Sequence, residues 1–207
     1  MAKKRDLNAK LDKELTEAGI PHYSEPIYRV SPKTFLKAVK KAKRVAGKDM
    51  WKVSLQSYED YKVKACYLSR DGKVGMCITK DGDVESLFNG GEKGGATGSL
   101  IPFAVAHGGK KLDCYGPRLP NTYSHFGAVA TGKVKFDPEY APPGWDGTTP
   151  DIVAMYLPKT VKGVIRNYDR HRTVDTSKLK TYSDYGEMLD DRDSKMSGKG
   201  AILPNIG

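Results

Sequence analysis

A glycine-rich stretch near the middle of the chain carries the residues best suited to chemistry. A short apolar run at residues 84–88 is followed by five glycines within residues 90–98, and glycine lets a backbone turn sharply and approach a ligand closely. Apolar residues then recur over residues 99–106, which predicts a buried helix. A helix that follows glycines offers free backbone N–H groups and a positive dipole end to a phosphate. The stretch predicts a strand, a phosphate-binding loop and a helix; a surface loop that binds nothing is the alternative.

Two familiar phosphate loops do not fit this stretch. The nucleoside-triphosphate loop needs a lysine directly before the Ser or Thr that enters the helix, whereas this chain has Thr97-Gly98-Ser99. The dinucleotide loop opens a parallel strand–helix–strand unit. The residues before this loop indicate a different arrangement.

Two Asp-Gly pairs divide the residues before the loop into β-like runs. Asp71-Gly72 and Asp81-Gly82 each stand between alternating apolar and polar residues, and Asp-Gly in that setting is the strongest short signal for a β-hairpin. We therefore expect residues 62–88 to form a three-stranded antiparallel meander that leads into the glycine loop.

A tyrosine further along is the second candidate for chemistry. Tyr123 stands four residues before Gly127, inside a short helix predicted at residues 119–126. Strands are predicted on either side of this helix, at residues 111–115 and 133–136, and a last hydrophobic strand at residues 152–157. A packed aromatic without a catalytic role is the alternative for Tyr123.

This order of elements resembles the GNAT superfamily of acyl-CoA-dependent N-acyltransferases. The usual loop of that family, Arg/Gln-x-x-Gly-x-Gly/Ala, falls in register with Lys93-Gly94-Gly95-Ala96-Thr97-Gly98, although the lysine and Ala96 depart from it. The family also has a tyrosine four residues before a glycine, which Tyr123 matches, but Ala128 stands where the family has an aromatic residue. The resemblance covers residues 27–157. It implies an α/β (α+β) fold with a mixed, largely antiparallel central sheet flanked by helices.

The resemblance also implies a reaction. An acyl-CoA, acetyl-CoA in the first instance, would be the co-substrate, an unidentified amine would attack its thioester, and no metal would take part. The backbone at Leu87 and Phe88 would hold the pantetheine and polarise the carbonyl, and Tyr123 would protonate the leaving thiolate. The pyrophosphate would be held by Lys93, Gly94, Gly95, Ala96, Thr97, Gly98 and Ser99.

The general base is less clearly indicated. Strand alternation places Glu85 and Asp83 on the same face, next to the glycine loop, and either carboxylate could accept the proton of the amine; solvated hairpin charges are the alternative. His107 and His125 are further candidates. The four histidines show no His-Glu-x-x-His or paired Cys/His spacing, so we expect no metal site.

The charge is unevenly distributed along the chain. The net charge is +10, with 13 Lys and Arg against 6 Asp and Glu in residues 1–50, 12 against 12 in residues 51–157, and 10 against 7 in residues 158–207. We expect a basic arm with a short helix at residues 1–26, the acyltransferase-like domain at residues 27–157, and a polar, partly disordered extension at residues 158–207.

This charge supports a second hypothesis. The basic excess in residues 1–50 would dock a non-catalytic GNAT-like module onto nucleic acid or a protein assembly. Ala96 in the loop and Pro102 near the start of the next helix favour that hypothesis. Plain solubilising charge is the alternative.

The rest of the composition indicates the cellular compartment of the protein and the state of its cysteines. No apolar run is long enough to span a membrane and no apolar segment follows the first basic residues, so we expect a soluble, cytoplasmic protein with no membrane partner. Cys66, Cys77 and Cys114 are isolated in β-like runs. We expect them to be buried, reduced thiols.

Overall fold

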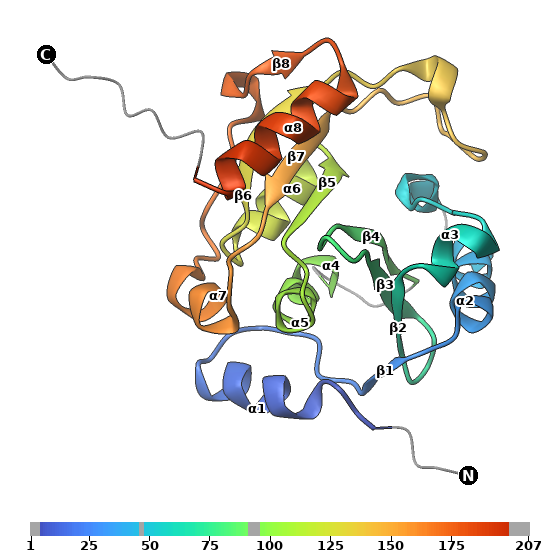
Figure 1. Cartoon of the computed structure of the whole chain (residues 1–207), viewed down its shortest axis with the longest axis vertical. Helices are drawn as coiled ribbons and strands as arrows, with labels where there is room; N and C mark the ends of the chain where they lie inside the picture. Colours follow the sequence, from blue (N-terminus) through green and yellow to red (C-terminus); the bar gives the residue numbers. More distant parts are fainter. Residues whose placement is uncertain (1–4, 46–47, 91–95, 199–207) are drawn as a thin grey trace, which may run out of the picture.

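The computed structural model describes residues 5–45, 48–90 and 96–198, and the strands within these ranges form two four-stranded sheets (Figure 1). The first sheet, ordered β1-β2-β3-β4, is antiparallel and consists of β1 (Ile27–Arg29), β2 (Ala65–Ser69), β3 (Val74–Ile78) and β4 (Val84–Asn89). The second, ordered β5-β7-β6-β8, consists of β5 (Lys111–Tyr115), β6 (Val129–Val134), β7 (Ile152–Tyr156) and β8 (Thr181–Tyr182). The expected α+β class is confirmed, but the strands divide between two sheets.

Both predicted hairpin turns form. Gly72 and Gly82 adopt φ angles of 73° and 94°, in the left-handed region that glycine reaches without strain. In the first turn the carboxylate of Asp71 accepts a hydrogen bond from the backbone N–H of Lys73 at 3.0 Å. The predicted antiparallel meander is therefore confirmed, and β1 joins it as a fourth strand beside β2.

Helix α2 (Pro32–Val45) covers one face of the first sheet. Its Phe35 and Val39 side chains are fully buried, together with Cys66, Cys77 and Phe88 from the sheet. The opposite side of α2 is lysine-rich and faces solvent. This helix forms as predicted from Ser31-Pro32.

The chain between α2 and β2 differs from the expectation. The meander was expected from residue 62, but Tyr58–Lys62 is the helix α3 and β2 begins only at Ala65. Ser57 and Asp60 form a capping box at its start, each side chain accepting a hydrogen bond from the other's backbone N–H, and these bonds stabilise a helix N-terminus. A 3-10 helix, η1 (Lys48–Lys52), precedes α3.

The helix predicted over residues 99–106 is divided in two. Helix α4 (Ala96–Ser99) ends before α5 (Ile101–Ala106) begins, and Pro102 lies in the first turn of α5, where its missing N–H costs no helical hydrogen bond. Ile101 and Phe103 of α5 are buried in the main core, to which residues of both sheets contribute. Helix α1 (Ala9–Glu17) packs on this core through Leu11 and Leu15.

Strands β5 and β7 form where the sequence predicts them and pair antiparallel. Helix α6 (Arg118–Ser124) follows β5, and β6 then begins at Val129, four residues before the predicted start. A long connection that includes the 3-10 helix η2 (Pro138–Tyr140) joins β6 to β7.

The C-terminal segment carries defined elements up to residue 198. It contains α7 (Val161–Asn167), η3 (Thr176–Lys178), β8 and α8 (Tyr185–Met196), and α8 lies across β6 and β7 (Figure 1). Partial disorder was expected here because apolar residues are sparse. Met188, however, is completely buried, in a small cluster with Tyr182, Val134 and Ala154.

Two further expectations concern the chain as a whole. Cys66, Cys77 and Cys114 are buried free thiols, as predicted. Among the described residues, no helix combines the length and apolar character needed to cross a membrane.

The packing of α8 can be tested by truncating its buried anchor. Met188→Ala is expected to lower the free energy of unfolding by about 2–5 kcal/mol, because it removes a buried side chain and leaves a cavity. Asp190→Ala, at an exposed position of the same helix, is the matched control and should change stability by less than about 0.5 kcal/mol. Urea unfolding of both variants gives the comparison, and equal small losses would show that α8 does not stabilise the fold.

Candidate functional site

The two sheets meet at one point and then diverge. Asp83 and Lys111 form an isolated parallel bridge between β4 and the start of β5, and the backbone N–H of Lys110 donates to the carbonyl of Gly82 at 2.8 Å. Beyond this bridge β4 and β5 belong to separate sheets. A cavity of about 500 Å³ opens between them, lined from both strands and from the segment 51–56.

A β-bulge in β4 lies beside this cavity. Glu85 lies opposite Cys77 and Phe88 opposite Gly75, so that two residues of β4, Ser86 and Leu87, face one residue of β3. Ser86 has a φ angle of 48°, which is uncommon for a residue with a side chain and marks a local strain.

The bulge lies between two backbone hydrogen bonds that tie the ends of β4 to β3. At the two ends of β4, Asp83 accepts from the N–H of Thr79, and Gly90 donates to the carbonyl of Lys73. Since Glu85 pairs with Cys77 and Phe88 with Gly75, the shift of register falls at Ser86 and Leu87. Leu87 lines the cavity, whereas Phe88 pairs with Gly75 and buries its ring beside Phe35.

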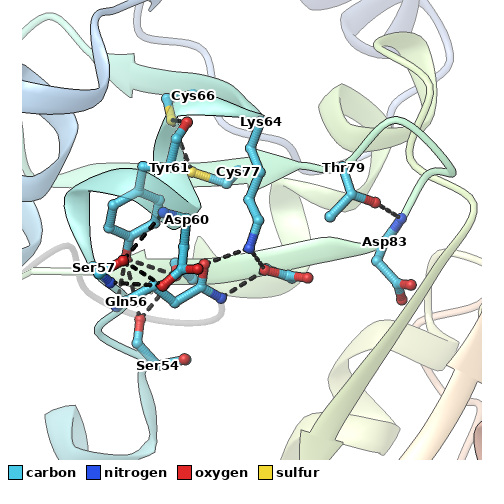
Figure 2. A network of polar contacts seen from close by, with 12 residues as sticks. Ser54, Gln56, Ser57, Asp60, Tyr61, Lys64, Cys66, Cys77, Thr79 and Asp83 are labelled. Carbon is cyan, nitrogen blue, oxygen red and sulfur yellow. Dashed lines mark hydrogen bonds and ion pairs between the residues drawn. The ribbon is translucent and has the colours of Figure 1, made fainter.

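Side-chain bonds hold the strained residue in place. The hydroxyl of Ser86 donates to the carbonyl of Ser54 at 2.8 Å and lies 3.0 Å from the hydroxyl of Tyr61 (Figure 2). Ser54 belongs to the segment that forms one wall of the cavity. The bulge and that wall are therefore fixed relative to each other.

Tyr123 reaches the cavity from α6. It is 4% exposed and lines the cavity, and burial raises the pKa of its phenol well above the ordinary value, with the nearby Cys114 and Asp113 acting in the same direction. Among the described residues, no hydrogen bond is formed by its hydroxyl group. Tyr123 thus offers a protonated, unengaged hydroxyl to whatever occupies the cavity.

The two carboxylates predicted on β4 both line the cavity, but each is already paired. Glu85 accepts from the amide of Gln56 at 2.6 Å and forms an ion pair with Lys64 (Figure 2). Asp83 forms ion pairs with Arg192 at 3.1 Å and Lys111 at 3.4 Å.

A third carboxylate, which the sequence did not single out, faces the cavity from β5. Asp113 is exposed on β5 and lines the cavity. Desolvation by the protein around it raises the pKa of its carboxyl, while Tyr185 and the charge of Arg192 act in the opposite direction. An Asp between Leu112 and Cys114 on a predicted strand is the only sequence signal for it.

Aromatic residues form the remaining walls. Trp51 of η1 packs against Tyr115 with ring centroids 5.1 Å apart. Tyr140 from η2 and Tyr185 from α8 also line the cavity. The site therefore combines residues from segments that span most of the chain.

The predicted phosphate loop is described only in part. Lys93, Gly94 and Gly95 lie outside the described residues, whereas Ala96, Thr97, Gly98 and Ser99 form α4. A Cβ at Gly98 would lie 2.5 Å from Cγ2 of Thr122 and 3.0 Å from its carbonyl oxygen. Gly98 is therefore required for the close packing of α4 on α6.

The two histidines considered as bases lie elsewhere. His107 packs on Phe103 with ring centroids 4.3 Å apart, and burial lowers the pKa of its imidazole. His125 is the C-terminal cap of α6. Neither lines the cavity described above.

Comparisons with known proteins do not extend this picture. No family model matches the chain, and neither the curated proteins nor the solved structures give a significant match. In the ranges that the structure describes, no group of three or more His, Cys, Asp or Glu residues is arranged to hold a metal ion. The functional inference therefore depends on the geometry of the cavity.

The raised pKa of Asp113 makes a prediction about stability. A carboxyl group whose pKa is raised on folding stabilises the protein below its ordinary pKa of 3.8, and this contribution is lost as pH rises through the folded pKa. Asp113→Asn removes the charge and is expected to raise the melting temperature at pH 8, with little gain at pH 4. Calorimetric melts of both proteins at the two pH values test this. A lower melting temperature at pH 8 would show that the charge is stabilised in place.

Proposed function

We propose that this protein is a GNAT-like N-acyltransferase that transfers the acyl group of an acyl-CoA, acetyl-CoA in the first instance, to an amine. The observation that carries the proposal is the cavity between β4 and β5. It is lined by Leu87 of the bulged strand β4 and by the buried Tyr123. A backbone donor and a phenol at one thioester would both favour direct acyl transfer.

The diverging edge of β4 suits the pantetheine arm. That arm is an extended chain with amide groups, and extended chains bind exposed strand edges through backbone hydrogen bonds. Leu87 lines the cavity at this edge. The N–H of Leu87 is the proposed donor to the thioester carbonyl oxygen, where negative charge develops during attack, and a fixed donor stabilises that charge.

The pyrophosphate is proposed to lie near the start of α4. The first N–H groups of a helix have no partner within the helix, which leaves those of Ala96 and Thr97 as the described part of this contact. Gly98 contributes by packing rather than by contact with phosphate, since its Cβ direction faces Thr122.

Tyr123 is proposed to be the general acid. The departing CoA thiolate needs a proton, and a phenol whose pKa is raised by burial stays protonated until it donates. Tyr123 and Leu87 of β4 line the same cavity. The acid and the oxyanion donor therefore belong to one site.

We expect Tyr123→Phe to bind acetyl-CoA with unchanged affinity while turnover falls by about 100-fold or more, as for loss of a general acid. Calorimetry measures the affinity, and thiol release with a panel of primary amines measures the rate. Tyr156→Phe, on β7 and outside the cavity lining, is the matched control. Absence of binding by folded protein at millimolar acetyl-CoA would overturn the proposal, and an unchanged rate would remove Tyr123 from the mechanism.

A second candidate function, docking onto nucleic acid, is favoured by the outer face of α2. Lys33, Lys37, Lys40 and Arg44 follow the helical repeat along one exposed stripe, and α2 contains no acidic residue. No ion pair involves these side chains among the described residues. By contrast, Lys10 and Lys13 of α1 lie 3.7 and 3.9 Å from the carboxylates of Glu14 and Glu17.

This stripe leads to a salt-dependent prediction. Lys37→Gln combined with Lys40→Gln is expected to weaken binding to a short DNA duplex and to reduce the slope of log affinity against log salt by about two, one for each phosphate that is no longer neutralised. Lys10→Gln with Lys13→Gln is the matched control and should leave the slope unchanged. Fluorescence anisotropy at several salt concentrations gives both slopes. Equal slopes, or no binding at low salt, would rule out this docking surface.

A further inference from the structure

Two of the three cysteines face each other across the first sheet. Cys66 of β2 and Cys77 of β3 lie directly opposite in the antiparallel register, and their Sγ atoms are 3.1 Å apart (Figure 2). Both are free thiols, and neither side chain is more than 1% exposed. Neither residue lines the cavity, so the pair is separate from the proposed acyltransferase site.

The backbone holds the two residues at a separation that a disulfide can span. The carbonyl of Cys66 accepts a hydrogen bond from the N–H of Val30, so the peptide groups of Cys66 point toward β1 and away from β3. Cys66 and Cys77 therefore form a non-hydrogen-bonded pair, the class with Cα atoms about 4.5 Å apart and closer side chains. Disulfides join Cα atoms about 4.4–6.8 Å apart, so rotation of the side chains is enough to close the gap between the sulfurs.

The two thiols differ in their surroundings. The S–H of Cys77 donates to Sγ of Cys66, whose own S–H lies 3.8 Å from the carbonyl oxygen of Tyr61. The bond from Cys77 lowers the pKa of the Cys66 thiol against the opposing effect of burial. The positive charges of Arg29 and Lys64 act in the same direction as that bond. Cys66 is therefore the better source of a thiolate, which is the form that attacks an oxidant.

We propose that Cys66 and Cys77 are a redox-active pair, which a peroxide converts to a reversible disulfide between β2 and β3. The inference does not depend on the acyltransferase function proposed above. Cys77 also lies opposite Glu85 of β4, next to the bulge at Ser86. The disulfide would thus brace the part of the sheet that carries one wall of the cavity.

The proposed reaction removes two electrons from the two thiols. The Cys66 thiolate attacks one oxygen of hydrogen peroxide, the O–O bond breaks, and the departing hydroxide becomes water with the proton that Cys66 has lost. Cys66 is then a sulfenic acid. The sulfur of Cys77 attacks Sγ of Cys66, the S–O bond breaks, and the second hydroxide leaves as water with the proton of Cys77. A dithiol reverses the reaction by thiol–disulfide exchange.

A peptide map detects the bond directly. Trypsin cleaves after Arg70 and Lys73, which places Cys66 on the peptide 65–70 and Cys77 on the peptide 74–80. After the folded full chain has been incubated with hydrogen peroxide and its remaining thiols alkylated, we expect these two peptides to be joined. Dithiothreitol should separate them again.

Cys114 is the internal control. It is also a buried free thiol, but its Sγ lies against Sδ of Met155, at 3.8 Å, instead of against a second cysteine. It should remain available for alkylation after the chain is unfolded. Cys114→Ser should form the bond as the natural protein does, whereas Cys66→Ser should leave the Cys77 peptide unjoined.

Glutathione redox buffers measure how far the fold favours the bond. The equilibrium constant for the disulfide should be about 100-fold larger in the folded protein than in urea, the scale of the loop-closure entropy for a ring of this length. Equilibrium is the appropriate readout, because oxidants reach buried sulfurs only through local opening of the structure.

Alkylation of all three cysteines after peroxide treatment of the folded protein would overturn the proposal, and so would a disulfide that includes Cys114. Equal equilibrium constants in buffer and in urea would show that the fold does not hold the pair ready to bond. If Cys66→Ser fails to fold, the peptide map of the natural protein decides by itself.

Discussion

Buried charges at the contact between β4 and β5 hold the two halves of the molecule together. Lys111 is 6% exposed, and its ammonium group lies 2.7 Å from Asp193 and 3.0 Å from Asp81. Arg192 is 1% exposed and joins Asp83 to Asp193. Burial by itself would lower the pKa of Lys111, but the hydrogen bonds that its ammonium group donates to Asp193 and Asp81 raise it. Removing one partner of such a network leaves a buried charge without a counter-charge, which is strongly destabilising. The first sheet, the second sheet and α8 therefore depend on one another.

The position of this network explains why a cavity exists. It joins β4 to β5 at the bridge between Asp83 and Lys111, and the strands are free to diverge beyond it. Leu87 of β4 and Tyr115 of β5 line the space that results, and Ser86, the strained residue beside Leu87, lines it too.

Three features that lower the stability of the fold lie around the cavity in which the proposed chemistry would take place. A strained backbone at Ser86, a phenol without a bond at Tyr123 and an unpaired carboxylate at Asp113 all border the same cavity in the part of the chain that the structure describes. Features of this kind lower stability, and proteins retain them at functional sites. Helix α8 belongs to this site as well as to the core, since it buries Met188 while Tyr185 contacts Asp113.

The sequence by itself determined the local elements: the two Asp-Gly hairpins, helix α2, strands β5 and β7, and Tyr123 as a candidate residue. These follow from backbone preferences and alternation within a few residues, which a single chain records directly. It placed the start of the meander at residue 62, where a capping box forms α3 instead. Only the tertiary structure decided the bulge at Ser86 and the packing role of Gly98. Each depends on a partner distant in the chain, since Ser86 donates to the carbonyl of Ser54, 32 residues away, and Gly98 packs on Thr122. Local patterns carry no information about such pairs.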